Sequence, residues 1–260
     1  MSASNFGLPD GTEDFVGVKA KELEKLRSIF LNYFYKNNCE LVIPSLIEFS
    51  EAIGGDANQS LKDYAYSFSD ENLKNISIRP DISQQIARID LQQGIKDKKK
   101  YCYFGETLRK TKDSLTKSKI AYKTGVEIFG KISIADEIDI IKLLLFSLKK
   151  AGKYKITLSL GRTEPLAEIL KNLGLSFNEN RKLKKIIASK SKTDLEEFFN
   201  SRGLNNRSLS EIKKLMEVNG KIECLNFLKK HKNKVFRSSA RKIEKIIKNL
   251  PASIDYHLDF

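Results

Sequence analysis

The spacing of apolar residues changes character at about residue 165, and this change most limits the folds open to the chain. Before it, residues 18–35 and 135–150 show the spacing of amphipathic helices, with short strand-like segments between them. Residues 166–250 show helical spacing alone, and strand-like alternation returns only in residues 253–260. The pattern therefore predicts a domain of mixed strands and helices that contains or precedes a small helical domain.

Two hairpins are predicted within the mixed domain. Residues 64–78 alternate loosely around an Asp-Glu-Asn turn at 70–72, as strands joined by a short turn do. Residues 101–109 and 126–129 form a second pair of strand-like segments. The polar, basic residues 110–120 between them predict a long charged loop at the tip of that hairpin.

Two helix starts in the helical domain are predicted from capping-box patterns. A Ser or Thr followed three residues later by Glu stands at 193–196 and again at 208–211. His231 lies among three lysines, so its side chain is expected to be exposed to solvent.

The charge of the chain is strongly basic and unevenly distributed. Lys and Arg number 47 against 33 Asp and Glu, and residues 181–250 alone hold 20 basic residues against seven acidic ones. Such asymmetry can mark a surface that binds nucleic acid or another polyanion. Only ten of the basic residues are Arg, however, and phosphate and base recognition prefer Arg, which favours a solvated, lysine-rich surface. Both interpretations stay open.

Cysteine and histidine usage excludes several classes of site. The three cysteines, Cys39, Cys102 and Cys224, are far apart and odd in number, which argues against a disulfide framework and a CxxC metal site. The two histidines, His231 and His257, supply too few nitrogen ligands for a zinc centre. No nucleophile elbow, P-loop or dinucleotide fingerprint occurs. We therefore expect no metal, no cofactor and no catalytic residues of these kinds.

The sequence also predicts a protein of the cytoplasm. The longest apolar stretch, residues 138–148, is interrupted by charges and is far shorter than the roughly 20 residues that span a bilayer. The first seven residues lack the basic and apolar regions of a signal peptide. We therefore expect no membrane partner.

Three segments combine charged residues with turns or strand ends. They read Ile-Arg-Pro-Asp-Ile-Ser at 78–83, before a predicted helix, Phe-Gly-Glu-Thr-Leu-Arg at 104–109, and Lys-Thr-Gly-Val-Glu-Ile-Phe-Gly at 123–130. Alone, each is typical of a surface charge beside a turn. Together they resemble the catalytic core of class II aminoacyl-tRNA synthetases, in particular the histidyl branch. The resemblance covers most of residues 7–165 and the final strand.

The resemblance assigns roles to two charged residues. Histidyl-tRNA synthetases carry an Arg at the end of the first strand of motif 2, and Arg109 stands at that position. Eighteen residues later they carry a Glu that contacts the amino group of the substrate, and Glu127 matches it. These residue types suit the task, because an amino acid needs a carboxylate for its ammonium group and a cation for its own carboxylate.

The departures from the synthetase pattern point to a different branch of the family. Arg109 is followed by Lys-Thr at 110–111, so the Glu of the synthetase Arg-x-Glu is absent. Lys117 replaces a second Arg, and Lys123 replaces a Gln. The Arg-Pro-Asp at 79–81, with a Gln-x-Ala-Arg-Ile run after it, is similar to the regulatory subunits of ATP phosphoribosyltransferase, which are synthetase paralogues without aminoacylation.

This resemblance implies an α+β fold: a class II synthetase-like core with a mainly antiparallel sheet flanked by helices, plus a small helical domain. Residues 1–165 would form the core, to which residues 251–260 return as a strand, and residues 166–250 would form a basic helical insertion. The family continues beyond that strand, so the carboxyl-terminal part of the core is expected to be missing from this chain.

The same resemblance implies a non-catalytic regulatory subunit that supports the first step of histidine biosynthesis and its inhibition by histidine. Expected partners are the catalytic subunit, histidine as effector and a second copy of the chain, whereas nucleic acid is not expected. The residues predicted to face histidine are Asp81, Ser83, Arg109, Lys123 and Glu127. Two alternatives stay open: a truncated or degenerate histidyl-tRNA synthetase, and an RNA-binding module on the same fold.

Overall fold

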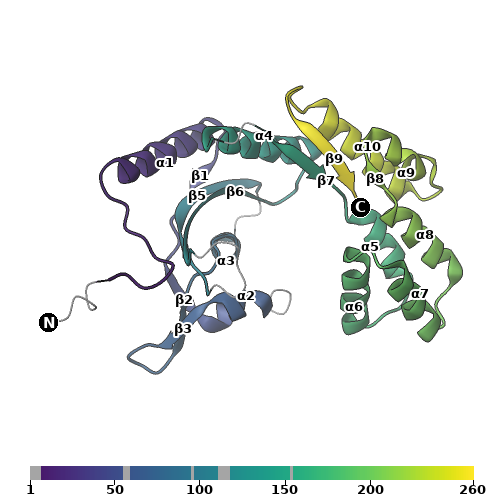
Figure 1. The fold of residues 1–260 in the computed structure, drawn as a ribbon, viewed down its shortest axis with the longest axis horizontal. Helices are drawn as coiled ribbons and strands as arrows, with labels where there is room; N and C mark the ends of the chain where they lie inside the picture. Colours follow the sequence, from purple (N-terminus) through teal and green to yellow (C-terminus); the bar gives the residue numbers. More distant parts are fainter. Residues whose placement is uncertain (1–6, 55–58, 95–96, 111–117, 153–154) are drawn as a thin grey trace. The chain divides into compact units, whose positions relative to one another are not determined.

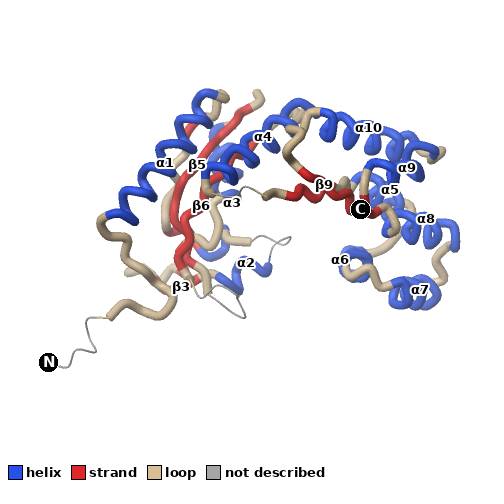
Figure 2. The backbone as a smooth tube through the Cα atoms, turned by 45° about the horizontal axis from the view of Figure 1, so that its top comes forward, coloured by secondary structure: helices blue, strands red, loops and turns tan. Residues whose placement is uncertain are grey.

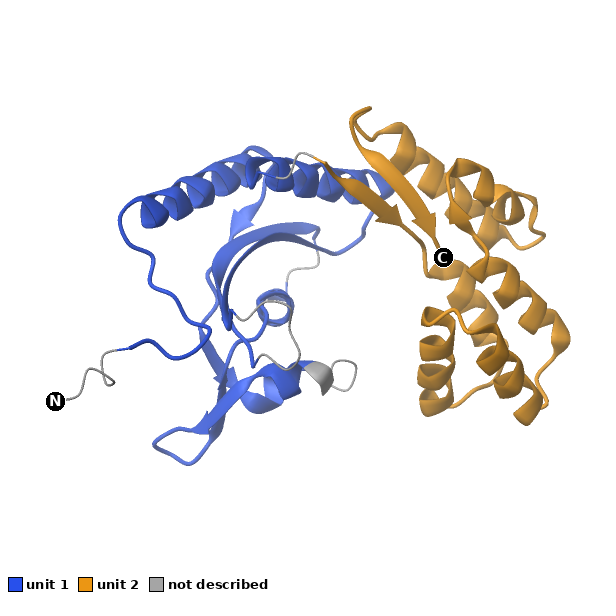
Figure 3. Ribbon diagram, in the orientation of Figure 1, with its two compact units in different colours: residues 1–152 blue, residues 153–260 orange. Residues whose placement is uncertain are grey.

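The computed structural model describes residues 7–54, 59–94, 97–110, 118–152 and 155–260. The chain divides into two compact units, which Figure 3 colours separately. Unit 1 comprises residues 1–152 and unit 2 comprises residues 153–260.

Unit 1 mixes helices and strands, as the sequence predicts. Its elements are α1 (Val18–Lys36), β1 (Glu40–Leu41), β2 (Ile47–Phe49), the short 3-10 helix η2 (Ser50–Ala52), α2 (Gln59–Tyr64), β3 (Tyr66–Ser69), β4 (Asn75–Ile78), α3 (Ser83–Gln93), β5 (Lys99–Leu108), β6 (Ile120–Phe129) and α4 (Ile134–Lys150) (Figure 1). The described strands of this unit form one sheet in the order β1-β5-β6 and another in the order β2-β4-β3. Apart from the parallel pair β1–β5, these strands pair antiparallel.

The long hairpin of β5 and β6 organises unit 1 (Figures 1 and 2). Its side chains alternate between two faces of the sheet, as they do along any strand. Cys102 and Val126 belong to the apolar cluster formed with α1 and α4. Tyr101 and Tyr103 point the other way and pack with Ile86 of α3. The odd-numbered residues of β5 and the residues paired with them in β6 therefore face the start of α3.

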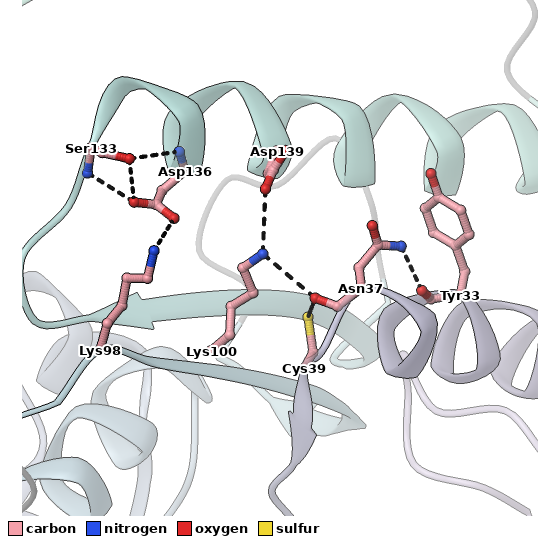
Figure 4. Close-up of polar contacts among 8 residues, drawn as sticks. All are labelled: Tyr33, Asn37, Cys39, Lys98, Lys100, Ser133, Asp136 and Asp139. Atoms are coloured by element: carbon pink, nitrogen blue, oxygen red, sulfur yellow. Dashed lines mark hydrogen bonds and ion pairs between the residues drawn. The ribbon is translucent and has the colours of Figure 1, made fainter.

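A buried carboxylate ties α4 to this hairpin. Asp136 is 4% exposed and accepts hydrogen bonds from the Ser133 amide (2.8 Å) and hydroxyl (2.7 Å) in a capping box. The Lys98 ammonium, just before β5, lies 2.8 Å from its other carboxylate oxygen (Figure 4). The Lys98 contact and the Ser133 hydrogen bonds hold the pKa of Asp136 well below its ordinary value.

We expect Asp136→Asn to lower the free energy of unfolding by about 2 kcal/mol at pH 7, because it removes the Lys98 ion pair and weakens the cap. A depressed pKa in the folded state means that this stability is present above about pH 4 and is lost as the pH falls through the folded pKa. Urea unfolding at pH 7 and pH 3, followed by circular dichroism, should therefore show a smaller difference between variant and wild type at pH 3.

Asp139→Asn on the same helix is the matched control. Asp139 is half exposed and lies 3.5 Å from Lys100 (Figure 4), so its loss is expected to change stability by less than about 0.5 kcal/mol. Equal effects of the two substitutions would contradict the role given to the Asp136 network.

Unit 2 is mainly helical. Its elements are β7 (Thr157–Leu160), α5 (Glu164–Lys171), α6 (Phe177–Ala188), α7 (Lys192–Ser201), α8 (Asn206–Met216), β8 (Asn219–Gly220), the 3-10 helix η3 (Ile222–Leu225), α9 (Asn226–Lys230), α10 (Lys234–Lys248) and β9 (Asp255–Asp259). Its three described strands form a sheet in the order β7-β9-β8. The apolar faces of the helices meet in a core that includes Leu183, Leu195, Ile212, Leu225 and Ile243.

The division into units differs from the sequence expectation in one respect. The final strand β9 pairs in parallel with β7, which lies within the predicted 1–165 core. The contacts of both strands nevertheless group them with the helices, so the compact unit begins at residue 153. The division into a 1–165 core and a 166–250 insertion stays a prediction.

Both predicted capping boxes in unit 2 are wrong. Helix α7 begins at Lys192 and is capped by Ser191, whose hydroxyl accepts from the Asp194 amide. Helix α8 is capped by Asn205, and its carboxamide oxygen accepts from the amide of Ser208, the residue predicted as the cap. In each case the cap is another good N-cap residue two or three positions earlier, since Ser and Asn are both favoured there.

Candidate functional site

Strand β4 leads into helix α3 through a charged turn. Asp81 lies just before α3, and its Oδ1 atom accepts a hydrogen bond from the Ile82 amide at 2.7 Å. This bond satisfies an amide at the start of the helix that has no helical partner. It also fixes the Asp81 carboxylate at the face of the β5–β6 hairpin.

Two cations of the hairpin converge on the other oxygen of that carboxylate. The Asp81 Oδ2 atom lies 3.0 Å from the Arg109 guanidinium and 3.2 Å from the Lys123 ammonium. The Arg109 Nε atom also donates to the Pro80 carbonyl at 2.7 Å. Burial by itself raises the pKa of Asp81, but the Ile82 amide and the two cations together hold the pKa below its ordinary value. Asp81 is therefore an anion at neutral pH.

A second cluster lies beside the first. The Ser83 hydroxyl, at the first position of α3, donates to the Glu127 carboxylate at 2.6 Å. The Tyr103 hydroxyl also hydrogen-bonds Ser83, and burial raises its pKa. Tyr103 reaches this point by crossing Gly125, its partner in the opposite strand, where a Cβ atom would lie only 2.6 Å from the phenol oxygen. Any side chain at residue 125 would therefore displace the Tyr103 phenol.

The buried side chain of Arg79 connects the segments that carry the site. It donates to the carbonyls of Glu106 (2.7 Å) and Pro44 (2.8 Å). The guanidinium passes over Gly105, where a Cβ atom would be 2.7 Å from it. Arg79 therefore joins the end of β4 to β5 and to the segment before β2.

All five residues predicted to face histidine lie together at this place. They form three contacts in two groups: Asp81 pairs with Arg109 and with Lys123, and Ser83 bonds Glu127. Their role toward a ligand stays a prediction. Thr111 and Lys117, two of the departures from the synthetase pattern, lie outside the described residues.

Sequence reasoning missed Tyr103 and Gly125 as members of the site. The available signal was strand alternation, which places Tyr103 and Gly125 on the same face as Glu127. The structure also shows that Lys110, which stands next to Arg109, lies over the ring of Tyr66 at 5.6 Å.

Two further properties of the described residues limit the chemistry. No group of three or more His, Cys, Asp or Glu residues within the described ranges could hold a metal ion. Among the helices described, none is long and apolar enough to cross a membrane.

Comparison with known proteins places the chain in a family. The family model described as histidyl-tRNA synthetase matches residues 11–260. The chain belongs to the histidyl-tRNA synthetase family. Within this family, it is 29% identical over 216 residues to the ATP phosphoribosyltransferase regulatory subunit of Methylococcus capsulatus, an alignment that covers 82% of this chain and 53% of the relative.

Solved structures of the histidyl-tRNA synthetase family share the fold. A protein from Bacillus halodurans, titled an ATP phosphoribosyltransferase regulatory subunit/histidyl-tRNA synthetase, matches with a TM-score of 0.76 at 16% identity and covers 100% of this chain and 69% of its own. The ATP phosphoribosyltransferase (HisG:HisZ) complex from Thermotoga maritima contains a chain that matches with a TM-score of 0.61 at 14% identity, with 91% and 80% covered. The α+β, class II synthetase-like fold predicted from the sequence is confirmed.

The chain spans about half the length of the curated relatives that it matches.

Proposed function

We propose that this protein is the non-catalytic regulatory subunit of an ATP phosphoribosyltransferase, required for the first step of histidine biosynthesis and for its feedback inhibition by histidine. Curated relatives with the name of that subunit support the proposal, since they match 76–85% of this chain in the first three cases. The departures of the sequence from an aminoacylating synthetase point in the same direction.

The charge balance of the site is the observation that carries this proposal. Asp81 and Glu127 supply two negative charges, and Arg109 and Lys123 supply two positive ones. An aminoacylating site must also hold the polyanionic phosphates of ATP, which requires an excess of cations. A balanced site instead suits a zwitterion such as a free amino acid.

The geometry suggests how histidine would bind. Its ammonium group would meet the Glu127 carboxylate, which accepts a hydrogen bond from the Ser83 hydroxyl. Its carboxylate would compete with Asp81 for Arg109 and Lys123, which are 39% and 28% exposed. Binding would thus exchange an internal ion pair for an external one.

The proposal includes the partners and the compartment. The catalytic subunit would form a hetero-oligomer with this chain, which would itself pair with a second copy. Large exposed apolar side chains around β2 support self-pairing, namely Ile43, Leu46, Ile47 and Phe49. All three cysteines are free thiols, as suits the reducing cytoplasm.

The test is phosphoribosyl-ATP formation by a short-form catalytic subunit, with and without this chain and with and without histidine. We expect at least 10-fold activation by the chain, inhibition by histidine, and co-sedimentation of the two subunits. Activation without inhibition would retain the partner role and reject the histidine site. No activation by folded protein, with an unrelated basic protein as control, would reject the proposal.

The charge of unit 2 favours RNA binding as the second candidate function. This unit holds 24 basic and 12 acidic residues, whereas unit 1 holds 23 and 21. An RNA-binding module, or a degenerate synthetase, would bind RNA with an affinity that falls steeply with salt concentration. Indifference to RNA in a filter-binding assay at 50 and 200 mM salt would exclude this candidate.

A further inference from the structure

Helix α8 of unit 2 borders two adjoining cavities, of about 410 and 610 Å³. Arg207, Glu211 and His231 line both of them, so the cavities meet at these side chains. Each volume falls in the range of about 300–1,000 Å³ that is typical of small-molecule sites. Neither cavity involves the residues of the candidate histidine site.

His231 lies at the junction of the cavities and is largely buried, contrary to the exposed position predicted for it. Its side chain is 13% exposed and stacks on Phe236 with ring centroids 3.8 Å apart, while Phe227 contacts it edge-on at 5.5 Å. The main-chain amide of Asn233 donates a hydrogen bond to the Nδ1 atom of His231 at 3.2 Å. The proton of the neutral ring therefore lies on Nε2, which is 3.6 Å from the Glu211 carboxylate. Aromatic side chains therefore lie where the two cavities meet.

The larger cavity is cationic. Arg207, Lys214, Lys230 and Lys232 line it, with Glu211 as its only acidic lining residue. In the described chain, these three lysines have no carboxylate within ion-pair distance, although the adjacent Lys213 and Lys229 pair with Glu196 and Glu244. Unpaired cations around an aromatic side chain favour a phosphorylated ligand, since Lys and Arg bind phosphate through charge-assisted hydrogen bonds.

The smaller cavity is lined by side chains that can form hydrogen bonds with the edge of a heterocyclic ring. Asn172, Asn205 and Asn233 line it with carboxamides, and Glu168 lines it with a carboxylate. The Asn205 oxygen caps α8 and the Asn233 oxygen accepts from the Val235 amide, so Asn205 offers its N–H groups and Asn172 offers its oxygen to a ligand. The Glu168 carboxylate accepts from the Asn233 amide group at 3.2 Å, which leaves its second oxygen available. Amide and carboxylate groups pair with the donors and acceptors on the edge of a nucleobase, which also stacks on aromatic rings.

We propose that the two cavities form one binding site for a nucleoside monophosphate. The phosphate would lie in the larger cavity among Lys214, Lys230 and Lys232, and the base would lie in the smaller one against the carboxamides. The ring of His231 and the neighbouring Phe227 would contact the base or the sugar at the junction. This site is separate from the proposed function and needs no catalytic subunit.

The test is isothermal titration of the full chain with AMP, GMP, CMP and UMP, and with inorganic phosphate and the four nucleosides. At least one nucleotide is expected to bind 10-fold or more tightly than inorganic phosphate and than its own nucleoside. The double substitution Lys230→Gln/Lys232→Gln should lower the affinity for that nucleotide about 10-fold and leave the affinity for its nucleoside unchanged. Phe227→Leu should lower the affinity for the nucleotide and for the nucleoside alike, because it removes an aromatic ring that would contact the base or the sugar.

Lys184→Gln/Lys185→Gln on α6 is the matched control, since these exposed lysines of the same unit lie outside both cavities. Circular dichroism melting curves would show that each variant is folded. Equal affinity for inorganic phosphate and nucleotides would overturn the site, as would equal loss of affinity in the two double-lysine variants. Both results would indicate a diffuse basic surface, whatever the outcome of the assay with the catalytic subunit.

Discussion

Replacing Glu127 with Gln is expected to raise the histidine concentration for half-inhibition by about 10- to 100-fold. The substitution removes the negative charge that would face the ligand ammonium, and a hydrogen bond to a charged group contributes about 1.5–3 kcal/mol. Gln keeps an oxygen that can accept the Ser83 hydroxyl, which now donates to Glu127 at 2.6 Å. Activation of the catalytic subunit should therefore persist. Titration of the reconstituted complex, and calorimetry of histidine with the chain alone, would measure the effect.

Asp81→Asn is expected to have the opposite effect on histidine affinity. Asn keeps an oxygen that can accept from the Ile82 amide but removes the negative charge that pairs with Arg109 and Lys123. Those cations become available to the ligand carboxylate, so histidine affinity is expected to rise several-fold. Glu22→Gln, on the exposed face of α1, is the control for loss of one carboxylate. If Glu127→Gln and Asp81→Asn lowered histidine affinity equally, the proposed competition between Asp81 and the ligand carboxylate would be disproved.

Replacing Arg79 with Met is expected to cost about 3 kcal/mol or more of unfolding free energy. Met fills much of the same volume but leaves the buried carbonyl of Pro44 and the part-buried carbonyl of Glu106 without their donor. Each unsatisfied buried acceptor costs about 1–3 kcal/mol. The loss should also loosen the start of α3, since the Arg79 main chain bonds Leu46 and Leu108 on either side. Urea unfolding and histidine titration would measure the two effects.

Arg27→Met is the control for this substitution. Arg27 lies on α1 and pairs at 3.6 Å with Glu24, an exposed neighbour one turn away. Its replacement is expected to change stability by less than about 0.5 kcal/mol. If Arg79→Met were equally mild, water would have to replace the guanidinium at these carbonyls, and Arg79 would not be a structural support of the site.

The elements around the site could be predicted from local sequence. The hairpin predicted over residues 64–78 is β3 and β4, and the strand predicted at 101–109 is β5 within one or two residues. The helix predicted after Pro80 is α3. These predictions succeed because period-2 and period-3.6 patterns and proline positions act within a few residues of the chain.

The environment of His231 could not be predicted in this way. Its neighbours in sequence are lysines, which predict an exposed side chain, whereas its neighbours in space are the rings of Phe227 and Phe236. The turn between α9 and α10 brings these rings together, and no local pattern encodes that turn. The predicted helix caps were wrong for a related reason. Several residues that can cap a helix lie close together in the sequence, and tertiary packing determines at which of them the helix begins.

The sequence by itself determined which residue types were present for the site, and the family resemblance drew Asp81, Ser83, Arg109, Lys123 and Glu127 into one set. Only the tertiary structure decided their pairing, in which Asp81 forms ion pairs with both cations and Ser83 donates a hydrogen bond to Glu127. The physical reason is that pairing depends on strand register and on the entry of α3 against the hairpin. Tyr103 can cross to Ser83 only because that register sets it opposite Gly125, a residue without a side chain.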